Sequence, residues 1–352
     1  MSKKNNVRIG YIDVAKFFFI VAIVLGHALN DGVLRMYVFS FHVPAFFFIS
    51  GYTSKGIDRK FSEYLIKRVK GILIPYFAFS ILSILAFAII SKVIPTVSQV
   101  IDCDIINNLK VMIYGNSKPD VMKYNSPLWF LPCMFCVSLI SWCSEFIGKK
   151  LNPDAVRVVT ILLCSAGGVF FSYNESIALP WHLETAVSMT VWYILGIIAR
   201  KLISENSSFD EKIVKKKLIF VILSFVLMSF GAVLCFLNDR VVGVRNEHYG
   251  IIPIYYLSAL FSILGFLCLS ICIEHNRLLE YIGKNTIGVL VFHKFVIIFA
   301  QFILDNKFGL KLHGDSVEGI IYIIILTVVS LSVSLLVTKL VIKICPFLLW
   351  KK

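Results

Sequence analysis

The stretch YIDVAKFFFIVAIVLGHAL, residues 11–29, decides the fold class, because it combines a long apolar run with three ionisable side chains. About 20 apolar residues in a helix cross a hydrocarbon layer about 30 Å thick. Ionisable groups in such a helix are costly in lipid and usually face a bundle interior or a cavity. The stretch therefore predicts a membrane helix whose Asp13, Lys16 and His27 need a reason to be there.

The rest of the chain has the same apolar character. Of its 352 residues, 58% are hydrophobic and 16% are charged, and the mean hydropathy is +0.83. A soluble domain carries about 25% charged residues. The apolar blocks predict helices at 11–30, 34–54, 71–92, 127–148, 156–174, 183–202, 216–237, 250–273, 285–304 and 318–347. We expect an all-α polytopic membrane protein of about ten transmembrane helices, with one domain over 1–352 and no appended soluble domain.

The net charge of +14 comes from basic residues concentrated in alternate connectors. This distribution is a topology signal rather than a nucleic-acid-binding stripe. The positive-inside rule predicts both termini in the cytoplasm, and we expect a multi-pass protein of the cell inner membrane. Most of the nine cysteines lie inside apolar runs, and the lone CxxC pair, Cys133 and Cys136, has no second pair, so no metal site is expected.

Lys16 and His27 share one face of the first helix at two depths. Their eleven-residue separation places them about 20° apart around the axis and about 16 Å apart along it. Asp13 lies one turn before Lys16 and could pair with it. In the second helix, RMYVFSFHVPAFFFISGYTS (35–54), His42 stands near the outer third. The spacing alone is also compatible with an interfacial Asp13–Lys16 pair and with a structural His42.

These motifs resemble the acyltransferase-3 family of membrane-bound acyltransferases. The lysine–histidine spacing of the first helix is followed by FHVPAFFFISGY (41–52). Three later segments are similar to further family motifs: RVKGILIPYF (68–77), PLWFL (127–131) and GKNTIGVLVFH (283–293). The segment LPWHLETAVSMTVWYILG (179–196) is most similar to the fucose acetylase-type branch. Two positions depart from the family pattern: Lys16 stands where arginine is commoner, and Thr286 where serine is usual.

The resemblance implies an O-acyltransferase that moves an acyl group, usually acetyl, from cytoplasmic acetyl-CoA to a hydroxyl of a cell-surface or lipid-linked glycan. On this interpretation His27 is the general base or forms a transient acetyl-histidine. Lys16 and Asp13 are its expected catalytic partners. Lys16, Arg68 and Lys70 are expected to bind the donor CoA through its phosphates.

Four residues are candidates for binding the acceptor: His42, Trp129, His182 and Glu184. His182 and Glu184 are two residues apart, so on a helix they would point about 200° from each other. His293 is buried in the expected ninth helix, where we expect packing more than chemistry. The expected partners are the saccharide acceptor and membrane lipid, and no nucleic acid.

Two other function classes remain open. A transporter or flippase for a lipid-linked sugar would also combine many helices with intramembrane charges, although no repeat of Gly/Pro-broken helices is visible. A glycosyltransferase with a polyprenyl-linked donor would lead us to expect acidic residues in the first outer loop, which holds only Asp31. Transfer of label from acetyl-CoA would separate an acyltransferase from both.

Overall fold

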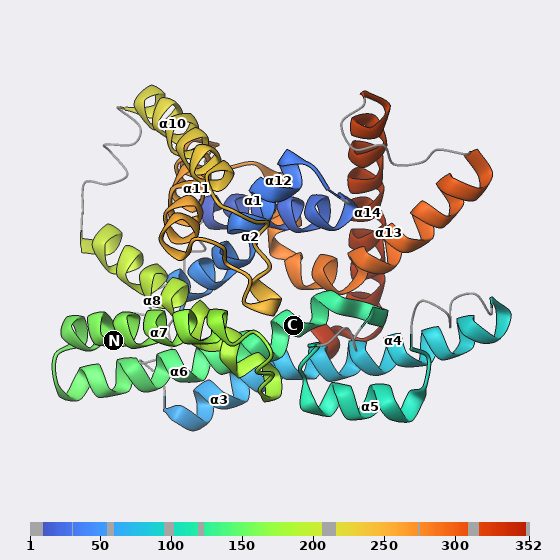
Figure 1. The fold of residues 1–352 in the computed structure, drawn as a ribbon, viewed down its shortest axis with the longest axis horizontal. Helices are drawn as coiled ribbons and strands as arrows, with labels where there is room; N and C mark the ends of the chain where they lie inside the picture. Colours follow the sequence, from blue (N-terminus) through green and yellow to red (C-terminus); the bar gives the residue numbers. More distant parts are fainter. Residues whose placement is uncertain are drawn as a thin grey trace.

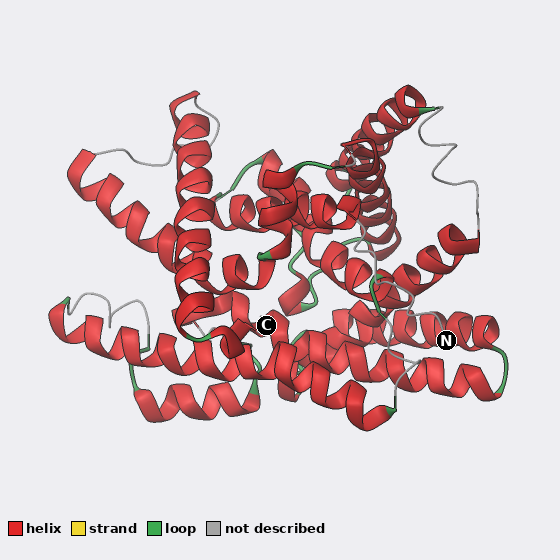
Figure 2. Cartoon of the chain, turned by 180° about the vertical axis from the view of Figure 1, so that it is seen from behind, coloured by secondary structure: helices red, strands yellow, loops and turns green. Residues whose placement is uncertain are grey.

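The computed structural model describes residues 10–29, 31–54, 60–94, 102–118, 123–205, 216–273, 275–308 and 317–349. Within these ranges the chain is built from helices and short loops, without a β-strand (Figure 2). Ten helical segments of the described chain are long and apolar enough to cross a membrane. The all-α polytopic prediction is therefore confirmed.

The helices lie close to the predicted apolar blocks. Their bounds are α1 Gly10–Ala28, α2 Val33–Tyr52, α3 Phe61–Arg68, α4 Ile74–Val93, α5 Ile105–Tyr114, α6 Phe130–Lys150, α7 Pro153–Tyr173, α8 Leu183–Glu205, α10 Lys217–Phe236, α11 Ile252–Ile273, α12 Arg277–Lys284, α13 Thr286–Phe308 and α14 Val317–Ile344. A π-helical turn, Val69–Leu73, joins α3 to α4, and four 3₁₀ turns cover Lys123–Trp129, Pro180–His182, Val244–Asn246 and Pro346–Leu349.

Helix α1 lies at the centre of the bundle (Figure 1). It packs against α2, α11, α12, α13 and α14. Its most apolar window is 61% buried inside the protein, whereas those of α7 and α10 are 11% and 17% buried. The ionisable residues of α1 are therefore carried by a helix that is surrounded by protein rather than by lipid.

The outer helices present apolar side chains on their free faces. On α10, Ile222, Phe225 and Val226 are exposed, and on α14 Ile324 and Val328 are exposed. A helix satisfies its backbone hydrogen bonds internally, and large apolar side chains make its surface compatible with hydrocarbon. These faces are the lipid-facing surface of the bundle.

Small residues let α2 and α8 approach to backbone contact. A Cβ added at Gly51 would lie 1.9 Å from the carbonyl oxygen of Tyr193, and one added at Gly196 would lie 2.0 Å from that of Phe48. Small residues at helix interfaces allow this approach in membrane proteins. This close packing fixes α8 beside α2.

Two short helices were not predicted because they are too short and too polar to read as membrane blocks. Asp104 caps α5 by accepting from the Asn107 N–H at 2.6 Å, and Gly115 ends it in the left-handed conformation. Asn276 caps α12 through the N–H groups of Leu278 and Leu279. Such caps stabilise short helices that apolar periodicity does not reveal.

The third membrane segment also begins earlier than predicted. The block predicted at 71–92 is preceded by α3, so helical structure runs over 61–93. The added turns carry Glu63, Lys67 and Arg68, which the apolar count excluded, while Tyr64 is buried. The extension matters for function because it brings Lys67 and Arg68 beside α1.

Candidate active site

The residues that the sequence singled out in α1 line two different cavities. His27 lines a cavity of about 390 Å³, which we call the His27 cavity. Lys16 lines a second cavity of about 310 Å³, the Lys16 cavity. The predicted placement of two polar levels along one face of α1 is therefore present in the structure. Lys16 Nζ lies 3.3 Å from Asp13 Oδ1, which confirms the predicted pair, and Asp13 is buried.

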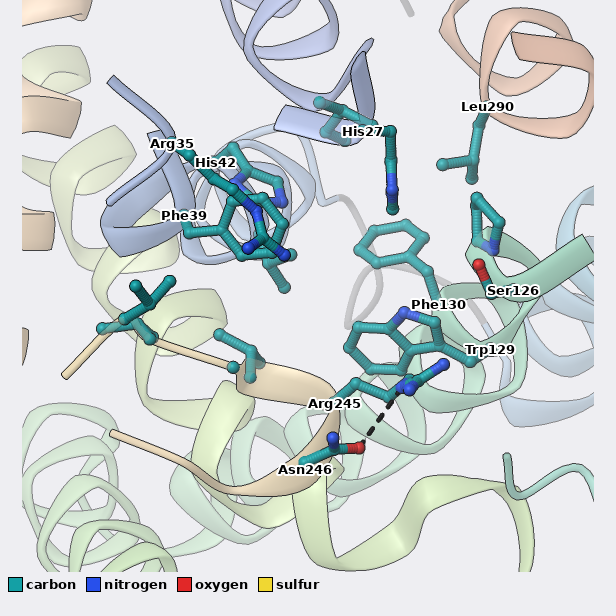
Figure 3. A pocket seen from close by; sticks show the side chains of 17 residues that line it. His27, Arg35, Phe39, His42, Ser126, Trp129, Phe130, Arg245, Asn246 and Leu290 are labelled. Carbon is teal, nitrogen blue, oxygen red and sulfur yellow. Dashed lines mark hydrogen bonds between the residues drawn. The ribbon is translucent and has the colours of Figure 1, made fainter. Parts of the chain in front are cut away.

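The His27 cavity is built from five parts of the chain, and its polar side chains approach from different directions (Figure 3). The His27 ring points into it from α1, while Arg245 and Asn246 reach it from the loop before α11. The remaining lining residues are Ile23, Arg35, Phe39, His42, Val43, Ser126, Pro127, Trp129, Phe130, Val241, Val242, Gly243, Val244 and Leu290.

The Lys16 cavity has a basic and hydroxyl-bearing lining. Lys16 shares it with Lys67 and Arg68, and Ser50 and Thr286 also line it. Arg68 donates from Nη2 to the Tyr193 hydroxyl at 2.8 Å and lies 4.9 Å from the centre of the Tyr64 ring. Lys70, predicted to bind CoA, is exposed and does not line this cavity, whereas Lys67 does.

One apolar wall separates the two cavities. Ile23, Phe130 and Leu290 line both of them. They come from α1, α6 and α13, so the wall forms where three helices meet. A histidine cavity and a basic cavity therefore meet at a single layer of apolar side chains.

His293 stands beside His27, a contact that the sequence did not predict. The two ring centres are 5.1 Å apart. His293 Nδ1 lies 2.9 Å from the Val289 carbonyl oxygen, which can only accept, so this nitrogen is the donor. In neutral His293 the lone pair is then on Nε2, a fully buried atom without a partner in the described chain. His42 is fixed in the same way, with Nδ1 donating to Val38 O at 2.5 Å.

His182 and Glu184 lie together in a buried network away from the His27 cavity. His182 Nδ1 is 3.5 Å from Glu184 Oε1, and Asn116 donates to the same oxygen at 2.8 Å. The expectation that the two side chains diverge is wrong, because Trp181 and His182 have φ of 59° and 53° and are not helical. Neither residue lines the cavity, whereas Trp129, 5.1 Å from the His182 ring, does.

Glu247 anchors the loop that carries Arg245, and no sequence pattern predicts this role. Its side chain is buried and accepts hydrogen bonds from Thr185 at 2.5 Å, Ser188 at 3.2 Å and Tyr249 at 2.7 Å. Burial raises the pKa of the Glu247 carboxyl above its ordinary value. Apolar patterning predicts only a connector at this loop, and its docking on α8 brings it to the cavity.

Other polar residues were also missed. No sequence motif singles out Arg35, at the start of an apolar block, or Lys67, in a basic connector. Within the described residues no cluster of three or more His, Cys, Asp or Glu has the arrangement of a metal site. Anion binding by arginine, lysine and imidazole is the chemistry that the two cavities offer.

Comparison with known proteins supports this description. A family model described as an acyltransferase domain matches residues 9–339, nearly the whole chain. No curated protein and no solved structure matches it. The matched region includes every residue of both cavities. The chain belongs to the acyltransferase-3 family and is a polytopic membrane acyltransferase.

Proposed function

We propose that this protein transfers an acyl group, most simply acetyl, from acetyl-CoA to a hydroxyl of a cell-surface or lipid-linked glycan. The observation that carries the proposal is the wall of Ile23, Phe130 and Leu290 shared by the two cavities. A basic cavity suits an anionic donor, and a histidine cavity suits a hydroxyl that must lose a proton. The reacting atoms of an acyl transfer have to come into contact, so the thioester would pass between these three side chains to reach the acceptor hydroxyl.

The donor belongs on the Lys16 side. Lys16, Lys67 and Arg68 would hold the phosphates of CoA by charge-assisted hydrogen bonds. Arg68 is fixed there by Tyr193 and Tyr64, so little side-chain entropy is lost on binding. By the positive-inside rule this side faces the cytoplasm, where acetyl-CoA is made, and the His27 side faces out.

His27 is the proposed base. Its neutral imidazole takes the proton of the acceptor hydroxyl as that oxygen attacks the thioester carbonyl. A C–O bond forms, the C–S bond breaks, and CoA leaves as a thiolate that regains a proton. In the covalent variant a His27 nitrogen attacks first, and the acceptor oxygen then displaces it from the acetyl group.

His293 supplies what an aspartate supplies in many other active sites. Once His27 has taken a proton, both of its ring nitrogens carry hydrogen and need acceptors. The Nε2 lone pair of neutral His293 is buried beside it. It would accept a hydrogen bond from the imidazolium, as a carboxylate does in a serine hydrolase. Because His293 is neutral, its attraction for the imidazolium charge is weaker than that of a carboxylate.

The experiment is label transfer in vesicles. Purified protein is given acetyl-CoA labelled in the acetyl group together with glycan and lipid-linked saccharide extracts. We expect label in a saccharide fraction with the wild type and a loss of roughly 100-fold or more with His27→Ala. His275→Ala is the matched control, since His275 is an exposed histidine on the chain before α12. Equal labelling by His27→Ala would overturn the assignment of His27, and no labelled saccharide with wild type would overturn the function.

A further inference from the structure

Two arginines line the His27 cavity. Arg35 enters its wall from α2 and Arg245 from the loop between α10 and α11 (Figure 3). None of the described residues that line it is aspartate or glutamate. A concave site lined by one sign of charge and by apolar walls focuses its field on whatever enters. The cavity is therefore matched to a negatively charged group.

The two arginines are held in place before any ligand arrives. The Arg35 guanidinium lies 4.8 Å from the centre of the Phe39 ring. Arg245 donates from Nε to Asn246 Oδ1 at 3.3 Å. Its loop is fixed because Glu247 points away from the cavity and accepts three hydrogen bonds from α8 and Tyr249. The Glu247 carboxyl is thus committed to the fold and not to the cavity.

The donor does not account for these charges. The Lys16 cavity has its own basic set, Lys16, Lys67 and Arg68, on the opposite side of the shared wall. In the proposed function, these three side chains bind the phosphates of CoA. Arg35 and Arg245 lie on the side of His27, where the proposed function puts the acceptor.

The chemistry of His27 points the same way. The guanidinium groups of Arg35 and Arg245 line the same cavity as its ring. Positive neighbours oppose proton uptake by an imidazole, and a nearby anion offsets them. A negatively charged acceptor would therefore favour proton uptake by His27.

Resting on the proposed function, we propose that the acceptor is an anionic saccharide, whose carboxylate or phosphate binds between Arg35 and Arg245 while its hydroxyl faces His27. The carboxylate would come from an acidic sugar, and the phosphate from a lipid-linked or phosphorylated one. Both present oxygen pairs that a guanidinium binds in a bidentate manner.

The test compares acidic and neutral acceptors. Saccharides extracted from the native cells are separated by anion exchange into neutral and acidic pools, and each pool is incubated with labelled acetyl-CoA and the protein in vesicles. We expect the acidic pool to take up at least about ten times more label. Chemical reduction of carboxyl groups abolishes uptake if the anion is a carboxylate, and phosphatase or mild acid abolishes it if the anion is a phosphate.

Variants show whether the arginines are responsible. Arg245→Gln and Arg35→Gln should each raise the KM for the acidic pool roughly tenfold, without an equal change in the KM for acetyl-CoA. Arg240→Gln is the matched control, because Arg240 lies in the same loop but is exposed and 4.0 Å from Glu175. Equal or greater labelling of the neutral pool, or equal effects of all three variants, would overturn the inference and leave the acyltransferase standing. Failure to label either pool would overturn the proposed function itself.

Discussion

Arg68 donates to the hydroxyl of Tyr193 at 2.8 Å, which joins the start of the third membrane segment to α8 at the Lys16 cavity. Arg68 belongs to α3, a stretch too polar to be predicted as part of a membrane helix, and Tyr193 is buried in α8. Their contact turns a basic connector into part of a cavity wall. Substitutions at Lys67 and Lys70 can show which basic residues of this segment face the donor.

Lys67 and Lys70 should differ in their effect on donor binding. Both side chains are exposed, but Lys67 lines the Lys16 cavity and Lys70 does not. We expect Lys67→Gln to raise the KM for acetyl-CoA roughly fivefold or more, because a charge-assisted contact with phosphate is lost. Lys70→Gln should stay within twofold of the wild type. A larger effect of Lys70→Gln would show that CoA binds outside this cavity.

The wall between the cavities should control transfer without controlling donor binding. Ile23→Trp enlarges a side chain that lines both cavities. We expect acetyl transfer to fall by roughly 100-fold, because a misplacement of reacting groups by about 1 Å is already that costly. Acetyl-CoA binding, measured by equilibrium dialysis, should stay within about fivefold. Ile325→Trp, on the exposed face of α14, is the control for added bulk; unimpaired transfer in Ile23→Trp would exclude a path through the wall.

His293 can be tested with two substitutions that each keep one of its nitrogen positions. His293→Asn preserves a donor at the Nδ1 position, which faces Val289 O, and His293→Gln preserves an acceptor near Nε2. We expect His293→Asn to lower kcat roughly tenfold or more, with little change in either KM, and His293→Gln to recover part of the loss. Equal kcat values for the two variants would point to packing alone.

Gly51 should tolerate no side chain. Its added Cβ would lie 1.9 Å from the Tyr193 carbonyl oxygen, and backbone cannot move as the end of a flexible side chain can. Overpacking of this kind costs about 1–3 kcal/mol or more, so we expect Gly51→Ala to lower the apparent melting temperature in detergent. Gly71→Ala is the control, since nothing lies within 4 Å of its added Cβ. Similar melting temperatures for the two variants would contradict the close contact of α2 and α8.

Glu247 should make stability depend on pH. Burial raises the pKa of its carboxyl above the ordinary value of 4.5 in the folded protein. A group of this kind adds stability at low pH and loses that contribution as the pH rises through its folded pKa. We expect the melting temperature of wild type, relative to Glu247→Gln, to fall as the pH rises above about 4.5.

Glu280 provides a control of opposite sign for this measurement. Hydrogen bonds from Lys284 and His275 lower the pKa of the partly buried Glu280 carboxyl. Glu280→Gln should therefore not reproduce the effect of Glu247→Gln. Parallel pH curves for wild type and Glu247→Gln would show that the carboxyl is not buried as described.

Sequence by itself determined the fold class and the first helix of the site. Apolar blocks of membrane length are a property of the chain alone, since a hydrocarbon layer sets their length. The fixed geometry of a helix is also enough to place Lys16 and His27 on one face at two depths. The family motifs added the reaction class, and the family match over residues 9–339 bears that out.

Only the tertiary structure decided which other residues join His27. Arg35, Arg245, His293 and the shared wall come from segments far apart in the chain, and no spacing rule relates them. Helix geometry predicted the wrong arrangement for His182 and Glu184. A left-handed turn at Trp181 and His182 replaces the expected helix and brings the two side chains together. Helix periodicity governs contacts within one element, whereas the site depends on how elements pack, and small residues such as Gly51 set that packing only in the folded bundle.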